Sequence, residues 1–270
     1  MIFTPYFKRP IMAVVISGTG LYTPTQSITN DEIVHCFNQY VEKFNLTHSR
    51  EIEDGEIDAL SPSDSSFIEK ASGIKSRYVM EKESILDVDI MSPRYTEREN
   101  DQLSMQAEIG VAAAKEAMLA ANKTPEDIDL IIVACAYTQR SYPAMAIEIQ
   151  NALGCGGWGF DMLVACSAAT FGIINAANAI RSGTAKTVLV INPEILSPQI
   201  NYRDRDSHFI FGDVATASII EDESTANAEH VFKIISEKPM TSFSNNIRSN
   251  IGYMNNCSPE NSNNADKFFI

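Results

Sequence analysis

The fold is decided by one stretch, Gly159-Phe160-Asp161-Met162-Leu163-Val164-Ala165-Cys166-Ser167-Ala168-Ala169-Thr170-Phe171-Gly172. It begins with a short apolar run at residues 160–165, which predicts a buried strand. The residues from 167 to about 181 are rich in Ala, Ile and Asn and predict a buried helix. Cys166 lies at the turn between the predicted strand and the predicted helix.

Cys166 has two opposing interpretations at this position. A thiol at a helix N-terminus faces unpaired backbone N–H groups and the positive end of the helix dipole, and both stabilise a nucleophilic thiolate. The same N–H groups can bind the oxyanion of an acyl intermediate. Against this, a free cysteine is usually a small buried hydrophobic residue, and the stretch alone favours that structural role.

Composition and charge limit the class of protein. The 270 residues include 21 Lys and Arg and 35 Asp and Glu, and the net charge of −14 argues against a nucleic-acid partner. No apolar run approaches the ~20 residues of a membrane span, and we recognise no secretory signal at the N-terminus. The five cysteines form no CxxC pair, so we expect reduced thiols in a cytoplasmic protein.

Strand and helix patterns alternate along the chain. Apolar runs predict buried strands at residues 13–16, 129–136, 160–165 and 187–192. Periodicity and capping residues predict helices at 29–44, 67–71, 103–121, 142–153 and 167–181. The alternation predicts an α/β fold with a largely parallel sheet and helices on both of its faces.

Turns and insertions complete this organisation. Gly18-Thr19-Gly20 predicts a turn after the first strand, and Phe211-Gly212-Asp213 predicts a turn between two strands within residues 207–220. Residues 45–66 and 81–100 are polar and charged, and they predict surface insertions. One more strand is predicted at 231–235, after which the pattern fades.

Four segments in a fixed order resemble one enzyme family. They are Ser72-Gly73-Ile74-Lys75-Ser76-Arg77, Ser141-Tyr142-Pro143-Ala144, residues 160–168 around Cys166, and Arg205 with Phe211-Gly212-Asp213. In this order and spacing the chain resembles β-ketoacyl-acyl-carrier-protein synthase III of the thiolase superfamily. The resemblance implies a thiolase-like αβαβα fold of two similar halves and a homodimer.

The resemblance also implies a division of the chain. Residues 12–222 match the first half, with insertions at 45–66 and 81–100, and residues 1–11 form an N-terminal extension. Residues 223–270 match an incomplete start of the second half, which is otherwise missing. On this basis the chain resembles a C-terminally truncated synthase.

The family's reaction has two stages and needs neither a metal nor a cofactor. Cys166 matches the catalytic cysteine that accepts an acyl group from acyl-CoA, the substrate. The acyl-enzyme then condenses with malonyl-acyl carrier protein in fatty acid biosynthesis, with loss of CO2. In the family, a His and an Asn stabilise the enolate formed in this step, and both positions lie beyond residue 270. We therefore expect acylation of this chain with little or no condensation.

Three further residues match substrate-binding positions of the family. Phe67 matches an aromatic that stacks on the CoA adenine, and Arg205 matches its cationic partner. Tyr142 stands where the family has a Phe that reaches into the partner subunit's pocket. The residues alone equally allow a core aromatic at Phe67 and an exposed ion-paired loop at Arg205. Ala71 replaces a basic residue of the family, and Asp213 is expected to make structural hydrogen bonds in a turn.

Other functions remain open at this point. The insertions allow a secondary-metabolite ketoacyl synthase, and the missing half allows a non-catalytic half-domain that binds CoA or a partner subunit. A redox-sensing thiol needs a resolving cysteine, and none is close to Cys166 in the sequence. The sequence leaves open the length of the acyl primer and the identity of the carrier protein.

Overall fold

The computed structural model describes residues 13–245, which belong to two compact units. Unit 1 contains the residues up to 22, 98–194 and 214–240, and unit 2 contains 23–97, 195–213 and those from 241. The predicted extension at 1–11 lies outside the described residues, as do residues 246–270. Within residues 13–245, we find no helix with both the length and the apolar character needed to cross a membrane.

A six-stranded sheet forms the centre of unit 1, in the order β5-β4-β6-β7-β1-β8. Its strands are β1 (Val14–Tyr22), β4 (Leu130–Cys135), β5 (Trp158–Leu163), β6 (Thr187–Ile195), β7 (Asp213–Asp222) and β8 (Phe232–Lys233). β4 pairs in parallel with β5 and β6, whereas β1 pairs antiparallel with β7 and β8. The α/β class is confirmed, but the prediction of a largely parallel sheet is wrong for the part around β1.

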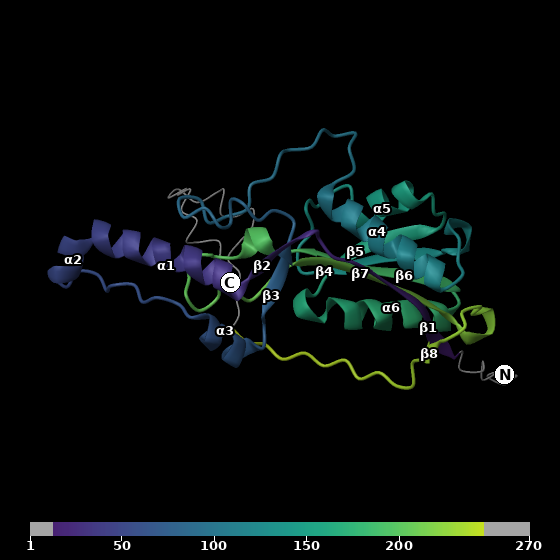
Figure 1. The fold of residues 1–270 in the computed structure, drawn as a ribbon. Coiled ribbons are helices and arrows are strands. Elements are labelled where there is room, and N and C mark those ends of the chain that lie inside the picture. The colour runs from purple at the N-terminus through teal and green to yellow at the C-terminus, as the bar shows by residue number, and fades with distance from the viewer. Residues whose placement is uncertain (1–12, 246–270) are drawn as a thin grey trace, which may run out of the picture. The chain divides into compact units, whose positions relative to one another are not determined.

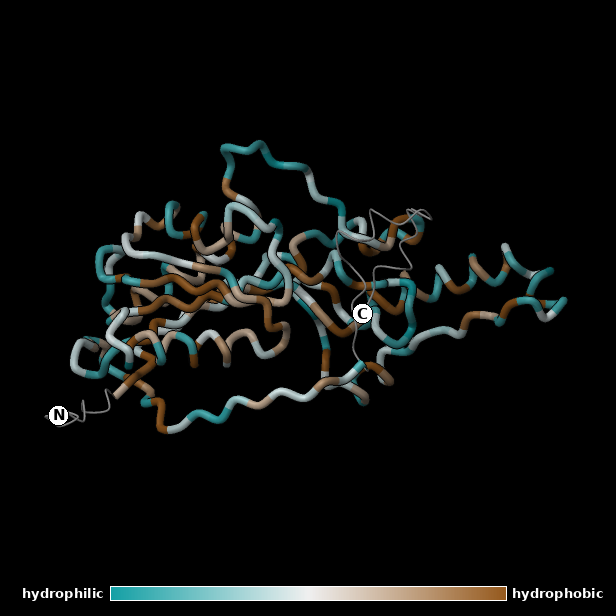
Figure 2. Tube along the Cα trace, turned by 180° about the vertical axis from the view of Figure 1, so that it is seen from behind, coloured by the Kyte–Doolittle hydropathy of each residue, from teal (hydrophilic) through white to brown (hydrophobic). Residues whose placement is uncertain are grey.

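Helices cover both faces of this sheet, as predicted. α4 (Met105–Ala120) and α5 (Met145–Leu153) lie on one face, and α6 (Ala168–Ser182) lies on the other (Figure 1). All six residues of β4 are buried, because the strand has a neighbour on each side and helices above and below. The strands form the most continuous hydrophobic segments of the chain (Figure 2).

The turn predicted at residues 18–20 is wrong, because β1 continues through it. A Cβ added to Gly18 would lie 2.3 Å from the carbonyl oxygen of Ala117, and one added to Gly20 would lie 2.0 Å from that of Ala113. The two glycines therefore let the backbone of α4 approach the strand. This is the close packing for which the Ala-rich sequence of α4 is suited.

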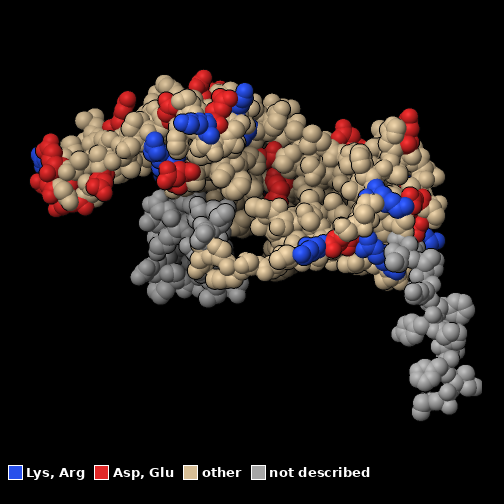
Figure 3. Space-filling view, turned by 90° about the horizontal axis from the view of Figure 1, so that it is seen from below, with Lys and Arg blue, Asp and Glu red and all other residues tan. Residues whose placement is uncertain are grey.

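Among residues 13–245, unit 2 contains three α-helices and a two-stranded antiparallel sheet. Its elements are α1 (Asn30–Thr47), α2 (Ser49–Glu53), α3 (Ser65–Ser72), β2 (Gln26–Thr29) and β3 (Ser76–Val79), with β2 and β3 antiparallel. The capping box of Thr29 and Glu32 is confirmed, and Gly73 ends α3 with a left-handed φ of 76°. Part of the segment 45–66 is helical, and acidic side chains gather at the end that carries α2 (Figure 3).

The strand predicted just before Gly212 is absent, and a compact turn takes its place. Here the backbone N–H groups of His208 and Ile210 donate to the carbonyl oxygens of Asp204 and Ser207. These local bonds use the backbone groups that a strand would need for its neighbours.

Asp213 is structural, but its bonds reach well beyond the predicted turn. It accepts hydrogen bonds from the backbone N–H and hydroxyl of Ser197 and from the N–H of Met80, at 2.7–2.8 Å. Burial raises the pKa of its carboxyl group. The side chain thus ties together three separate segments of unit 2.

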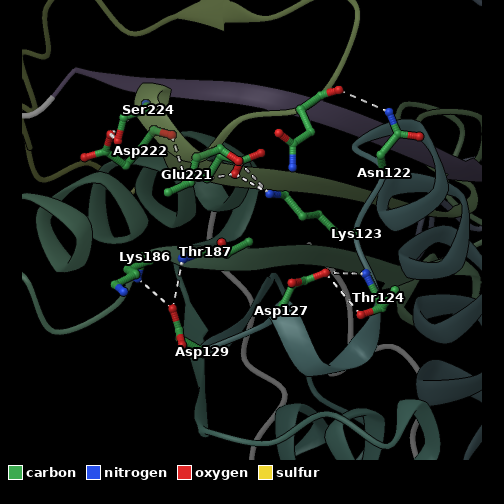
Figure 4. A network of polar contacts seen from close by, with 12 residues as sticks. Asn122, Lys123, Thr124, Asp127, Asp129, Lys186, Thr187, Glu221, Asp222 and Ser224 are labelled. Atoms are coloured by element: carbon green, nitrogen blue, oxygen red, sulfur yellow. Dashed lines mark hydrogen bonds and ion pairs between the residues drawn. The ribbon is translucent and has the colours of Figure 1, made fainter.

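A buried ion pair joins the end of α4 to the end of β7 in unit 1 (Figure 4). Lys123 Nζ lies 2.7 Å from Glu221 Oε2, and the two side chains are only 6% and 0% exposed. Thr225 contacts both partners, since its carbonyl accepts from Lys123 at 3.0 Å and its hydroxyl donates to Glu221 at 3.2 Å. Asn122 adds a bond to the carbonyl of Asn227, 3.2 Å away.

We predict that Lys123→Met lowers the free energy of unfolding by about 3 kcal/mol or more, because it leaves the buried Glu221 carboxylate without a counter-charge. The measurement is urea denaturation followed by circular dichroism. Lys233→Met is the matched control: it removes the exposed Lys233–Glu223 pair, and we expect a change below about 0.5 kcal/mol. Equal losses in the two variants would contradict this account.

Candidate active site at Cys166

The turn that carries Cys166 is positioned by strand pairing. β5 pairs in parallel with β4, and its last residue, Leu163, lies opposite Cys135. The N–H of Val164 then donates to the carbonyl of Cys135 at 3.3 Å, which holds the chain as it leaves the sheet. The next three residues, Ala165–Ser167, form a single 3-10 turn, and α6 begins directly after it. Cys166 therefore lies at the carboxyl edge of the parallel strands.

Backbone strain and exposure distinguish Cys166 from a core thiol. Ala165 has a φ of 47°, in the left-handed region that non-glycine residues rarely adopt. Such strain persists only where the surroundings enforce it, and it often marks functional sites. Cys166 itself is exposed, one residue before the N-cap of α6, and the N-cap Ser167 makes no side-chain capping bond. The first N–H groups of α6 are thus not capped by that serine.

The prediction that this strand and this helix are buried is wrong. β5 is the edge strand of the sheet, so one side of its backbone has no neighbouring strand among the described residues. Trp158 and Leu163 are 46% and 58% exposed. α6 buries one face, which includes Gly172 and Ala176, and leaves Ala169 and Thr170 exposed.

Asp161 joins the strand before Cys166 to the loop of Tyr142. Its two carboxylate oxygens accept hydrogen bonds from the N–H groups of Met145 and Ala146 at 2.7 and 2.8 Å, so a side chain of β5 caps the N-terminus of α5. Tyr142 lies just before α5, after the carboxyl end of β4, and is 85% exposed. Tyr142 and Cys166 therefore follow adjacent parallel strands at the same edge of the sheet.

The other described cysteines differ from Cys166. Cys36 and Cys135 are buried, and burial raises the pKa of their thiols to about 11 and about 12. Burial also raises the pKa of the partly buried Cys155. Cys257 lies outside the described residues. Among the four thiols that the structure describes, only Cys166 is exposed.

Glu194 is a titratable group at this edge that the sequence analysis missed. It lies near the end of β6, and its Oε1 accepts a hydrogen bond from the N–H of Ala136 at 2.8 Å. Its Oε2 is buried and has no hydrogen-bond partner among the described residues. Burial raises the pKa of Glu194 to about 7. Sequence could flag the residue only as a charge at the end of an apolar strand.

The structure brings Phe67 and Arg205 together in unit 2. The guanidinium carbon of Arg205 lies 5.2 Å from the centre of the Phe67 ring, and Arg205 Nε donates to the carbonyl of Pro62 at 2.8 Å. The ring of Phe67 is 42% exposed, so it does not belong to the core. Ala71, on the same helix α3, is exposed as well. Cys166 and Tyr142 belong to unit 1, whereas Phe67 and Arg205 belong to unit 2.

The residues at these positions suit acyl chemistry better than metal binding. Over residues 13–245, no three His, Cys, Asp or Glu side chains are grouped so that they could hold a metal ion. An exposed thiol beside the N-terminus of a 15-residue helix can form a thioester, and backbone N–H groups there can stabilise the negative charge of its formation.

Comparison with known proteins identifies the family. Residues 160–237 match the family model of 3-oxoacyl-[acyl-carrier-protein (ACP)] synthase III. A β-ketodecanoyl-[acyl-carrier-protein] synthase of Pseudomonas aeruginosa is 51% identical over 237 residues, covering 88% of this chain and 68% of that protein. The chain belongs to the 3-oxoacyl-[acyl-carrier-protein] synthase III family.

Solved structures of related enzymes have the same fold. The 3-oxoacyl-[acyl-carrier-protein] synthase III of Aquifex aeolicus is 29% identical with a TM-score of 0.58, and the match covers 78% of this chain and 54% of that one. The priming β-ketosynthase of the R1128 polyketide pathway is 25% identical with a TM-score of 0.59, over 82% and 54% of the two chains. The thiolase-like fold is thus confirmed, and the chain spans about half the length of these enzymes.

We predict that Glu194 makes stability fall as the pH rises. Its pKa rises from 4.5 to about 7 on folding, so the folded state favours the protonated carboxyl group. Below pH 4.5 the group is protonated in both states. Between pH 4.5 and 7 the unfolded state loses this proton more readily than the folded state, so the free energy of unfolding falls as the pH rises. Compared with Glu194→Gln, the wild type should be equally stable near pH 4.5 and about 3 kcal/mol less stable near pH 8. The check is denaturant unfolding at both pH values. A difference between the proteins that does not change with pH would refute it.

Proposed function

We propose that this chain carries the acyl-accepting site of an acyl-CoA-primed 3-oxoacyl-[acyl-carrier-protein] synthase. The observation that carries the proposal is the exposed Cys166, held by a left-handed Ala165 at the start of α6 in a chain of this family. In the first stage the Cys166 thiolate attacks the thioester carbonyl of acyl-CoA. A carbon–sulfur bond forms, CoA leaves as its thiolate, and that thiolate takes up the proton that Cys166 lost.

The N-terminus of α6 supports this step electrostatically. The negative charge that develops on the carbonyl oxygen requires hydrogen-bond donors and a positive potential, and a helix N-terminus supplies both. Condensation of the acyl-enzyme with malonyl-acyl carrier protein, in fatty acid biosynthesis, is proposed for the whole protein. The acylation of Cys166 is proposed to need no metal and no cofactor, because the CoA ester is itself the substrate.

We propose an eight-carbon primer. The relative from Pseudomonas aeruginosa is named for a ten-carbon ketoacyl product. Decarboxylative condensation with a malonyl unit adds two carbons, so a ten-carbon product requires an eight-carbon acyl group on the cysteine. The identity of 51% with that protein supports the same preference here.

The adenine of CoA is proposed to stack on the pair formed by Phe67 and Arg205. An exposed aromatic ring in contact with a guanidinium, 5.2 Å from its centre, forms a flat cationic and aromatic surface on which a purine can stack. Ala71, on the same helix as Phe67, contributes no charge to the phosphates of CoA.

A homodimer is proposed through the side of unit 1 that carries β5 and Tyr142. β5 is an edge strand with exposed Trp158 and Leu163, and Tyr142 is 85% exposed beside it. An exposed edge with large apolar side chains is suited to pairing with a second copy. Nucleic acid is not a proposed partner, and neither is a membrane. The free thiols are consistent with a cytoplasmic location.

A second candidate function is the priming of a polyketide rather than of a fatty acid. It is favoured by one observation, the similarity to the priming β-ketosynthase of the R1128 pathway at a TM-score of 0.59. The first stage of the reaction is the same in both proposals. They differ in the carrier protein that receives the product.

The proposal predicts one equivalent of CoA released per chain. We expect octanoyl-CoA to release CoA at least about tenfold faster than acetyl-CoA, since a buried acyl chain gains about 0.8 kcal/mol per CH2 group. Chromatography of rapidly quenched samples measures the free CoA, because a thiol-sensitive dye would also react with the exposed Cys166. Cys166→Ser should abolish it, whereas Cys155→Ser, which removes another thiol of unit 1, should leave it unchanged. Release that persists in Cys166→Ser, or faster release from acetyl-CoA, would refute the proposal.

A further inference from the structure

His208 is buried in unit 2, and its ring contacts two phenylalanine rings, one stacked and one edge-to-face. The side chain is 1% exposed. Its ring stacks on Phe37 of α1 with 4.8 Å between the ring centres, and the edge of Phe209 meets it at 5.4 Å. Phe37 is itself part of the core of the unit, so the imidazole has a rigid support.

The hydrogen bonds of the ring fix where its proton lies. Nδ1 lies 3.1 Å from the carbonyl oxygen of Asp204 and 3.0 Å from that of Arg205. A carbonyl oxygen only accepts, so Nδ1 must carry the proton and donate to both. Nε2 is buried without a hydrogen-bond partner among the described residues, and burial lowers the pKa of His208 to about 4. The imidazole is therefore a neutral donor at physiological pH.

These bonds hold the backbone of Arg205, whose side chain makes the contact with Phe67. At one end of Arg205 the carbonyl accepts from His208, and at the other the guanidinium bonds to Pro62 and lies over the Phe67 ring. Arg205 is thus fixed from both ends. The His208 ring is the hydrogen-bond partner of the Arg205 carbonyl, and the backbone N–H groups of Ser207 and His208, which donate to the carbonyl of Asp204, hold the neighbouring part of the loop.

Arg203, two residues earlier, illustrates why this orientation matters. Its guanidinium lies 5.5 Å from the centre of the Tyr40 ring and donates to the carbonyls of Asp89 and Ile90. The same short loop therefore sends two arginines to two different aromatic rings. The backbone conformation at residues 204 and 205 directs the side chain of Arg205 away from that of Arg203. The His208 ring donates its hydrogen bonds to the carbonyl oxygens of these two residues, Asp204 and Arg205.

We propose that His208 is a positioning residue that holds the guanidinium of Arg205 over Phe67 through its bonds to the carbonyls of Asp204 and Arg205. This inference rests on the proposed nucleotide site, and it assigns to the buried histidine a role in CoA affinity. The imidazole does not touch the substrate. Its effect on CoA binding passes entirely through Arg205.

The test measures CoA affinity by isothermal titration calorimetry under reducing conditions. His208→Phe keeps a ring against Phe37 but removes the donor, and we expect CoA to bind about fivefold more weakly, as for the loss of one net hydrogen bond. His208→Asn keeps an N–H near the Nδ1 position and should bind within about twofold of the wild type. If His208→Phe does not fold, as judged by its thermal melt, His208→Gln supplies the loss variant, because its amide reaches the Nε2 position instead.

His48 offers a matched control within the same unit. Its ring also stacks on a phenylalanine of α1, Phe44, at 4.2 Å, and its Nδ1 also bonds a carbonyl oxygen, that of Phe44, at 2.9 Å. It has no hydrogen bond to the Arg205 loop among the described residues. His48→Phe should therefore leave CoA affinity unchanged.

A double-mutant cycle separates positioning from general destabilisation. In an Arg205→Ala background, His208→Phe should have no further effect on CoA affinity, since its only route to the ligand is already removed. An equal fivefold loss in that background, or wild-type affinity of folded His208→Phe, would overturn the inference. If the wild type does not bind CoA, the inference falls with the nucleotide site. If CoA binding follows the cycle but Cys166 releases no CoA from acyl-CoA, the positioning role stands and the proposed reaction fails.

Discussion

The parallel pairing of β5 with β4 is the interaction on which the candidate site depends. It sets Leu163 opposite Cys135, so that the chain leaves the sheet at the edge where β4 also ends. Four residues, 164–167, separate β5 from α6, and Cys166 is the middle residue of the 3-10 turn that the last three form. A one-residue slip would invert every side chain of β5, and Asp161 would lose its bonds to the start of α5.

Unit 2 differs from unit 1 in that a small hydrophobic core supports a loop with exposed polar and aromatic groups. Phe37, Tyr202 and their neighbours form the core, and the loop before β7 is tied to it by Asp213 and His208. Because these ties are buried, the exposed groups of the loop need few contacts of their own. Arg205 can therefore remain accessible over Phe67 while its backbone is held.

Much of this could be predicted from the sequence, and the failures have physical causes. The apolar run of β4 and the capping box of α1 are local signals, and both were predicted correctly. Gly18 and Gly20 suggested a turn, but a glycine also serves wherever another backbone approaches, and only the three-dimensional packing of α4 distinguishes the two. An apolar run likewise does not encode whether its neighbour is parallel, or whether the strand lies at an edge.

The candidate functional residues divide in the same way. Cys166, Phe67, Arg205 and Tyr142 were proposed because they match positions of a family. The strained Ala165 and the buried His208 have no sequence signature, and Glu194 stands out only as a charge at the end of an apolar strand. The central claim is that the turn between β5 and α6 makes Cys166 the acyl acceptor. Peptide mapping by tandem mass spectrometry after incubation with octanoyl-CoA tests it directly. The account predicts an octanoyl group on the peptide of Cys166 alone, and acylation of another cysteine with Cys166 unmodified would contradict it.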